Sequence, residues 1–173
     1  PTQFGTDEDF DKYPRTLDAD RDVIAAEGGC DVIYAPTGIY DATHATNIMP
    51  TGVALPMEGK VRPHFFAGVA TVVSKLFHHI PADFAIFGEK DFQQLAVIRQ
   101  MVRDLDIDIG IIAHPTIREA DGLALSSRNQ YLTKPQRRLA PKIYAQMQIT
   151  SALINNGTDI NTAIHQAKNQ LQK

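Results

Sequence analysis

Phe84-Ala85-Ile86-Phe87-Gly88-Glu89-Lys90-Asp91 is the stretch that decides the fold of this 173-residue chain. Four apolar residues are followed by a glycine and three charged residues, and apolar side chains then recur at helical spacing from about 91 to 105. A strand that runs through a glycine turn into a helix is typical of a βαβ unit. Ligands of open α/β sheets bind beyond the carboxyl ends of the strands, where a helix N-terminus favours anions. Lys90 is therefore a candidate phosphate ligand.

This turn also fits an ordinary strand-to-helix connection whose charged side chains contact only water. The chain contains neither the P-loop pattern nor G-x-G-x-x-G, so neither of these two phosphate cradles applies. On the residues of the turn alone, both interpretations stay open.

The sequence next to this stretch predicts the rest of a parallel sheet. Apolar residues at helical spacing predict a helix from about 67 to 79, and residues 107–113 have the pattern of a strand. Further upstream, residues 31–36 are expected to form a short buried strand. The alternation of strands and helices predicts an α/β fold with right-handed crossovers.

Two further predictions concern the N-terminal part of the chain. Thr16 can cap a helix that carries acidic residues in its first turn and ends at Gly28-Gly29. Residues 36–63 are rich in proline and are expected to form loops, with one edge strand near Val53.

The last third of the sequence changes character. Residues 116–132 are a polar connector that contains glycine and serine, helical sequence follows from 135 to about 155, and Thr158 is expected to cap a last helix. We therefore expect two domains, residues 1–114 and 115–173. The second has the pattern of a helical lid or of the start of a further domain.

Asp121-Gly122-Leu123-Ala124-Leu125-Ser126-Ser127-Arg128-Asn129 is a second candidate site. Two adjacent hydroxyls and a guanidinium on a glycine-bearing connector match the hydrogen-bonding needs of phosphate oxygens. Serine and asparagine are also frequent in ordinary turns, because their side chains bond to nearby backbone groups. Taken alone, this stretch fits a plain loop as well as a phosphate site.

Composition excludes several classes of function. The formal net charge is -3 with 17 Lys+Arg against 20 Asp+Glu, so the basic surface of a nucleic-acid-binding protein is absent. No apolar run approaches the roughly 20 residues that cross a bilayer, and the first residues do not resemble a secretory signal. The single cysteine, Cys30, and the scattered histidines predict no metal site. A cytoplasmic protein is the default expectation.

Several strings, in order along nearly the whole chain, closely resemble the pantoate–β-alanine ligase family. The two most specific are Phe87-Gly88-Glu89-Lys90-Asp91-Phe92-Gln93-Gln94-Leu95 and Arg118-Glu119-Ala120-Asp121-Gly122-Leu123-Ala124-Leu125-Ser126-Ser127-Arg128-Asn129. Shorter matches are Pro1-Thr2-Gln3-Phe4-Gly5, Tyr13-Pro14-Arg15-Thr16 and Phe66-Ala67-Gly68-Val69.

The resemblance implies a fold and an activity. The fold is a nucleotidyltransferase-type Rossmann domain followed by a smaller C-terminal lid domain, of which this chain holds parts. The activity is the ATP- and Mg²⁺-dependent condensation of pantoate with β-alanine to pantothenate, through a pantoyl-adenylate, with release of AMP and pyrophosphate. The family is usually dimeric, so a homodimer is expected on the same ground.

The resemblance also carries functional residues over to this chain. The ATP-binding turn is expected at Gly88, Glu89, Lys90 and Asp91, with Lys90 at the phosphates and Asp91 near the ribose. A second set of ATP contacts is expected at Leu125, Ser126, Ser127 and Arg128, with a backbone contact at Ile117. The residues expected to act in catalysis are Lys90, Ser126, Ser127 and Arg128. Gln3 and Gln94 match two glutamines that hold pantoate.

The sequence departs from the family pattern in three places. The family's H-x-G-H motif lies upstream of the first glutamine motif and is absent from this chain, which opens inside the glutamine motif. The C-terminal domain also stops early. We therefore expect a piece of a longer enzyme that is nearly inactive alone. In addition, His64 stands one position before the family's usual histidine, since Phe65-Phe66 follows it.

Other functions stay open at this point. A nucleotide-binding or dimerisation fragment without catalysis fits the missing histidine motif. A cytidylyltransferase-like or tRNA-synthetase-like domain would use similar geometry, although the acidic charge balance disfavours tRNA.

Overall fold

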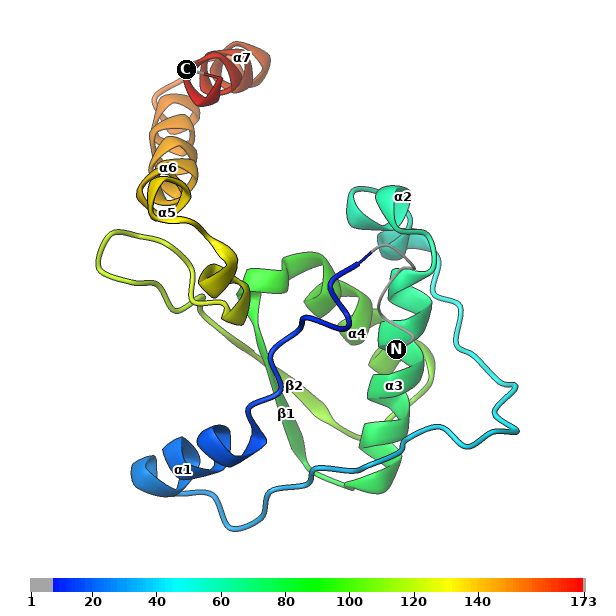
Figure 1. Cartoon of the computed structure of the whole chain (residues 1–173). Helices are drawn as coiled ribbons and strands as arrows, with labels where there is room; N and C mark the ends of the chain where they lie inside the picture. Colours follow the sequence, from blue (N-terminus) through cyan, green and yellow to red (C-terminus); the bar gives the residue numbers. More distant parts are fainter. Residues whose placement is uncertain (1–7, 173) are drawn as a thin grey trace. The chain divides into compact units, whose positions relative to one another are not determined.

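The computed structural model describes residues 8–172, which form two compact units divided between Pro115 and Thr116 (Figure 1). Gln3, which was expected to hold pantoate, lies outside the described residues. Among the described residues, no helix is both long and apolar enough to span a membrane.

A parallel pair of strands forms the centre of the first unit. Strand β1 (Phe84–Gly88) pairs with β2 (Gly110–His114), in a register that sets Phe84 opposite Gly110 and Gly88 opposite His114. The short 3₁₀ helix η2 (Glu89–Asp91) and helix α4 (Phe92–Asp104) connect them. The strand–turn–helix–strand order predicted from residues 84–113 is therefore confirmed.

Helices α3 (Phe65–His79) and α4 build the core of this unit against one face of the sheet. The core consists of apolar side chains from both helices and from one loop: Ala54, Phe66, Val69, Ala70, Val73, Val97, Ile98 and Met101. Phe87 and Ile111 from the strands pack against this cluster, whereas Phe84 and Ile86 are exposed. The predicted helix over residues 67–79 is confirmed and begins two residues earlier, at Phe65.

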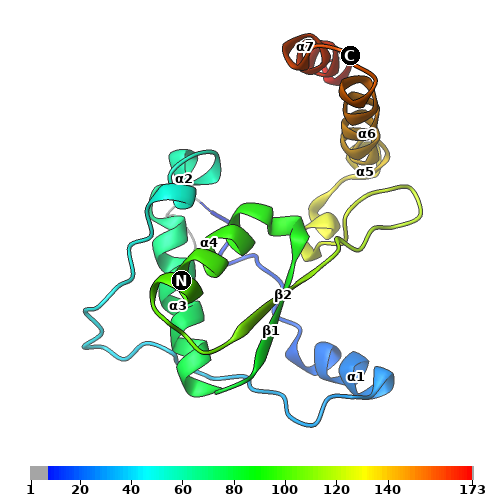
Figure 2. The same ribbon diagram turned by 180° about the vertical axis from the view of Figure 1, so that it is seen from behind.

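The predicted strand at residues 31–36 is wrong. Helix α1 (Leu17–Glu27) forms as expected and ends at Gly28, whose φ of 73° few other residues adopt. The following segment is an open connection without a strand (Figure 2), and the side chain of Val32 is 78% exposed. A strand exists only where a neighbour pairs with its backbone, and β1 and β2 pair with each other in the described sheet.

The predicted edge strand near Val53 is also wrong. Residues Gly52–Ala54 form the 3₁₀ helix η1, and the amide of Leu55 bonds to the carbonyl of Gly52 at 3.1 Å. Gly52 has a φ of +55°, a left-handed conformation that starts a turn and interrupts a strand. The short helix α2 (Glu58–Val61) follows.

The second unit contains the 3₁₀ helix η3 (Ser127–Tyr131) and three α-helices: α5 (Lys134–Leu139), α6 (Pro141–Asn155) and α7 (Ile160–Leu171). The helical sequence predicted over 135–155 is divided at Pro141, because proline has no amide to donate into a continuous helix. Asp159, rather than the predicted Thr158, caps α7, since its carboxylate accepts from the amide of Thr162 at 2.9 Å.

Candidate functional site

The predicted ATP-binding turn lies where β1 ends and α4 begins. Gly88 ends the strand with extended backbone angles, φ −72° and ψ 136°. A Cβ built at this position meets no atom within 4 Å, so one side of the Gly88 backbone is open. Because glycine carries no side chain there, a ligand can approach this backbone closely.

The charged residues of the turn are accessible. The Nζ atom of Lys90 lies 3.7 Å from a carboxylate oxygen of Asp91, and the two side chains are 41% and 63% exposed. Asp91 precedes the first turn of α4, but its carboxylate accepts no capping hydrogen bond from that turn. No side chain therefore caps the N-terminus of this 13-residue helix, and a helix N-terminus favours an anion.

Two adjacent glutamines follow in the first turn of α4. Gln94, the predicted pantoate ligand, is half-buried. The side-chain amide of Gln93 donates to the carbonyls of Val53 and Pro56, at 3.0 and 2.7 Å, and its oxygen accepts from the amide of Glu58 at 3.1 Å. Gln93 thus ties the loop before α2 to the helix that carries Gln94. The sequence does not reveal this role of Gln93, because the partners of its side chain are backbone atoms that no side-chain motif contains.

His64, which stands one position from the family's usual histidine, lies exposed at the N-terminus of α3. The two phenylalanines that follow have structural roles. Phe66 is 3% exposed in the core, and the Phe65 ring lies 4.1 Å from the guanidinium carbon of Arg62. Phe65, which separates His64 from Phe66, therefore contacts Arg62 at the C-terminal end of α2.

The second set of predicted ATP contacts lies in the second unit. The amide of Leu125 donates to the carbonyl of Ile117 at 2.9 Å, so these two predicted nucleotide contacts are neighbours. Ser126 directly precedes η3, and its hydroxyl accepts from the amide of Arg128 at 3.3 Å. Ser127 and Arg128 begin η3 with exposed side chains. One short segment therefore carries two hydroxyls and a guanidinium on its surface.

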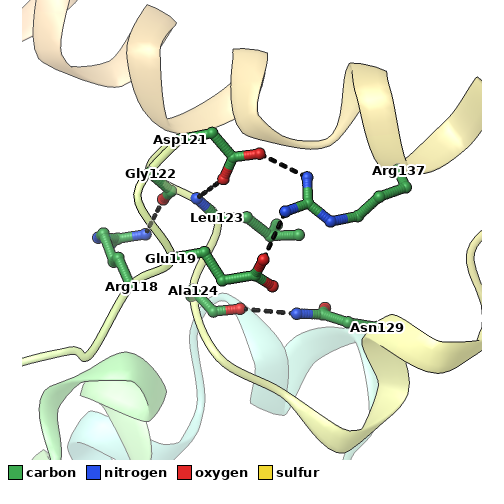
Figure 3. A network of polar contacts seen from close by, with 8 residues as sticks. All are labelled: Arg118, Glu119, Asp121, Gly122, Leu123, Ala124, Asn129 and Arg137. Carbon is green, nitrogen blue, oxygen red and sulfur yellow. Dashed lines mark hydrogen bonds and ion pairs between the residues drawn. The ribbon is translucent and has the colours of Figure 1, made fainter.

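A tight turn leads into this segment (Figure 3). Arg118 and Ala124 form an isolated antiparallel bridge, and the amide of Gly122 bonds to the carbonyl of Glu119 at 2.8 Å. Gly122 has a φ of +92°, which an L side chain rarely adopts. The side-chain amide of Asn129 donates to the carbonyl of Ala124 at 3.0 Å and closes the segment from the other side.

Arg137 of α5 joins both acidic residues of this turn. Its guanidinium donates to Asp121 and to Glu119, each at 2.6 Å. The hydrogen bond from Arg137, followed by that from the amide of Leu123, holds the pKa of Asp121 below its usual value of 3.8. The same carboxylates raise the pKa of Arg137. Arg137 was not among the residues expected from the sequence, although two acidic residues followed by a basic helix turn are a weak signal for such a pair.

Comparison with known proteins decides what these two segments belong to. The family model described as pantoate-beta-alanine ligase matches residues 1–173. The chain belongs to this family. The family predicted from the sequence motifs is therefore confirmed.

Sequence relatives of this ligase family are similar throughout the chain. A pantothenate synthetase of Caulobacter vibrioides is 48% identical over 174 residues, which cover 99% of this chain and 61% of the relative. A pantothenate synthetase of Moorella thermoacetica is 51% identical over 159 residues, which cover 91% of this chain and 56% of the relative. The chain thus spans less than two thirds of the length of these relatives.

Solved structures of the ligase family confirm the predicted α/β fold with a parallel sheet. A pantothenate synthetase from Thermus thermophilus superposes with a TM-score of 0.95 at 42% identity, covering 99% of this chain and 63% of the other. A pantoate-beta-alanine ligase from Francisella tularensis, complexed with beta-gamma ATP and beta-alanine, gives a TM-score of 0.78 at 40% identity. That match covers 84% of this chain and 56% of the other.

Proposed function

We propose that the protein carrying this chain condenses pantoate with β-alanine at the expense of ATP and forms pantothenate. The observation that carries the proposal is the family match across residues 1–173. The relative from Francisella tularensis, complexed with beta-gamma ATP and beta-alanine, supports the choice of two of the three substrates.

The reaction takes two displacements. In the first, a carboxylate oxygen of pantoate attacks the α-phosphorus of ATP, the bond from that phosphorus to the bridging oxygen breaks, and pyrophosphate leaves. In the second, the amine of β-alanine attacks the acyl carbon of the pantoyl-adenylate, the acyl C–O bond breaks, AMP leaves and the amine loses a proton. No covalent bond to the protein is needed, so positioning and charge stabilisation supply the catalysis.

Charge is the main obstacle to the first displacement, because the attacking carboxylate and the triphosphate are both anions. We assign Lys90 to the phosphates, with the backbone of Gly88 and Glu89 beside them and Asp91 at the ribose. The amides that begin α4 add a positive partial charge at the same edge of the sheet. These groups offset charge that builds up in the transition state.

The second group of ATP ligands is assigned to Ser126, Ser127 and Arg128, with backbone contacts at Ile117 and Leu125. A guanidinium and two hydroxyls give directional bonds to phosphate oxygens. Gln94 and Gln3 are assigned to pantoate, since a glutamine amide donates to a carboxylate or hydroxyl without adding charge.

Mg²⁺ is the expected partner of ATP in this reaction. Within the described residues 8–172, no group of three or more His, Cys, Asp or Glu side chains could hold a metal ion. Mg²⁺ is commonly bound by one or two carboxylates together with substrate phosphates. The residues therefore fit a metal that arrives with the triphosphate, where it would neutralise phosphate charge. A homodimer is proposed on the family resemblance alone, and a cytoplasmic location is kept as the default expectation from the sequence.

Pantoate-dependent exchange of labelled pyrophosphate into ATP tests the proposed function. The assay is made on the protein as its gene encodes it, with pantoate and without β-alanine, so that it reports the first displacement only. We expect exchange with pantoate and background exchange with acetate or lactate. ATP binding without pantoate-dependent exchange would contradict the proposal and favour a nucleotide-binding role without catalysis.

A further inference from the structure

The turn of residues 118–124 is held by two arginines, one on a neighbouring helix and one within the turn itself. Arg137 reaches it from α5 with two 2.6 Å hydrogen bonds, one to Glu119 and one to Asp121 (Figure 3). Arg118, within the turn, donates to the carbonyl of Gly122 at 3.1 Å, and its guanidinium carbon lies 3.5 Å from the centre of the Tyr144 ring of α6. The turn is therefore fastened to two helices.

Arg137 is unlike an isolated surface ion pair. An exposed pair contributes little, because holding two long side chains in one geometry costs entropy and water screens the charges. Here one planar guanidinium serves two carboxylates, and its side chain is 32% exposed. The carboxylate of Asp121 also accepts from the amide of Leu123 at 3.2 Å, so one side of the ion pair is already fixed by the backbone.

Arg137 itself lies on a well-formed helix turn. The hydroxyl of Thr133 caps α5, and its amide donates to the side chain of Gln136 at 2.8 Å, which completes a capping box. The amide of Arg137 then bonds to the carbonyl of Thr133 at 2.8 Å. The guanidinium therefore starts from a fixed backbone.

The geometry of the turn passes directly to the segment that we assign to phosphate. Leu125 leaves the turn bonded to Ile117 at 2.9 Å, and Asn129 bonds back to Ala124 at 3.0 Å. Ser126 and Ser127 lie between these two fixed points. A change in the turn therefore changes where their hydroxyls point.

We propose that Arg137 is a positioning residue for ATP, which holds the turn of residues 118–124 so that Ser126, Ser127 and Arg128 present their donors in one arrangement. The inference rests on the proposed role of those three residues in phosphate binding. Arg137 contacts no substrate in this proposal. It acts through Glu119 and Asp121.

A stability role alone would have different consequences from a positioning role. If the ion pairs only stabilise the fold, losing them lowers the melting temperature and leaves the affinity of the folded protein for ATP unchanged. If they position the phosphate ligands, ATP binding weakens in protein that remains folded, and pantoate binding does not. Comparing the change in ATP affinity with the changes in pantoate binding and melting temperature therefore separates a positioning role from a stability role.

The experiment compares Arg137→Ala, Arg137→Lys and the control Arg138→Ala in the protein as its gene encodes it. Arg138 is the next residue on α5, is exposed, and makes no ion pair that the structure of residues 8–172 records, so its loss removes the same charge only. The readouts are the Kd for a non-hydrolysable ATP analogue without pantoate, the KM values for ATP and pantoate, and the melting temperature.

Removing a partner that orients a metal-ligating side chain commonly costs about 10- to 100-fold in metal affinity or activity, and we expect the same scale for a partner that orients phosphate ligands. We therefore expect Arg137→Ala to raise the Kd and the KM for ATP about 10- to 100-fold relative to Arg138→Ala, with an unchanged KM for pantoate. Arg137→Lys should be intermediate, because an ammonium keeps the charge but cannot fork between two carboxylates. Glu119→Gln should also weaken ATP binding. This variant replaces Arg137→Ala in the comparison if Arg137→Ala does not fold.

An ATP Kd for folded Arg137→Ala equal to that of Arg138→Ala would overturn the inference, and so would equal weakening of ATP and pantoate. Wild-type protein that binds the analogue but lacks pantoate-dependent exchange would overturn the proposed function only, because the Kd comparison still judges Arg137. Wild-type protein that does not bind the analogue would overturn both.

Discussion

Each of the two units of this chain is stabilised internally by a different kind of interaction. In the first, α3 and α4 bury a contiguous apolar cluster in which Val69, Val97 and Ile98 are 0% exposed. In the second, Ala163 is the one buried apolar residue among the described residues 116–172, and the turn before η3 is fastened by guanidinium–carboxylate bonds. Packing therefore positions Lys90, whereas hydrogen bonds and charge position Ser126 and Arg128. The first segment should respond to changes of side-chain volume, and the second to changes of charge.

The largest expected effect comes from making a cavity in the first unit. Ile98→Ala should lower the free energy of unfolding by about 2–5 kcal/mol, because the apolar contacts are lost and the space left is filled only partly. Chemical denaturation followed by circular dichroism measures this. Ile149, in α6, is 54% exposed, so Ile149→Ala is the matched control and should cost far less. Equal losses for the two variants would contradict the contrast between the units.

The next effect separates activity from stability within the first unit. Lys90→Ala should slow pantoyl-adenylate formation by about 10²–10³-fold, the usual result of removing one preorganised donor. Its free energy of unfolding should change by no more than about 0.5 kcal/mol, because an exposed side chain takes no part in packing. Pyrophosphate exchange measures the rate, with the exposed Lys60→Ala as control. Adenylation at the parental rate would exclude Lys90 from the phosphate role.

A smaller loss of stability is expected when a helix cap in the second unit is removed. Thr133→Ala removes the capping box of α5, the helix that carries Arg137, and should cost about 0.5–2 kcal/mol of stability. Thr158→Ala should cost less, because Asp159 supplies the cap of α7. Thermal unfolding of the two variants measures the difference. A larger loss for Thr158→Ala would restore the cap predicted from the sequence.

The smallest effect is the response of the second unit to acid. The pKa of Asp121 is lowered by Arg137 and by the amide of Leu123, so its ionised form is favoured in the folded state. The stability from these bonds is complete above the usual value of 3.8 and is lost as the pH falls through the lower, folded pKa. The amide of Leu123 should therefore lose protection from hydrogen exchange below pH 3.8, before amides in the middle of α4 do. Asp121→Asn should abolish this step, and a midpoint above 3.8 would contradict the assignment.

The sequence predicted the parts of this fold that depend on local patterns. Helices α3 and α4 have strong periodicity, and β1 is a short apolar run that ends at Gly88. The predicted strands at 31–36 and near Val53 failed, because apolar content does not reveal whether a neighbouring backbone is available to pair. A strand is a property of two segments, while a helix is a property of one.

The candidate site also contains residues that a local pattern predicts and residues that it does not. The motifs that contain Lys90 and Ser126 are continuous in the sequence, and so the family resemblance could assign them. The residues that support these motifs are distant: Arg137 lies 16 residues from Asp121, and Gln93 lies 40 residues from Val53. Supporting contacts of this kind depend on how the chain folds back, and a linear pattern does not contain that information.

The three hydrogen bonds of Gln93 have a consequence for the chemical ageing of the protein. The amide group donates to the carbonyls of Val53 and Pro56 and accepts from the amide of Glu58. Spontaneous deamidation would replace it with a carboxylate, which only accepts. Two carbonyl oxygens would then face a negative charge at distances suited to donation, and the loop would be pushed away from the helix that now holds it. A change of one mass unit at this position would thus release the loop of residues 53–58 from the helix that carries the expected pantoate ligand.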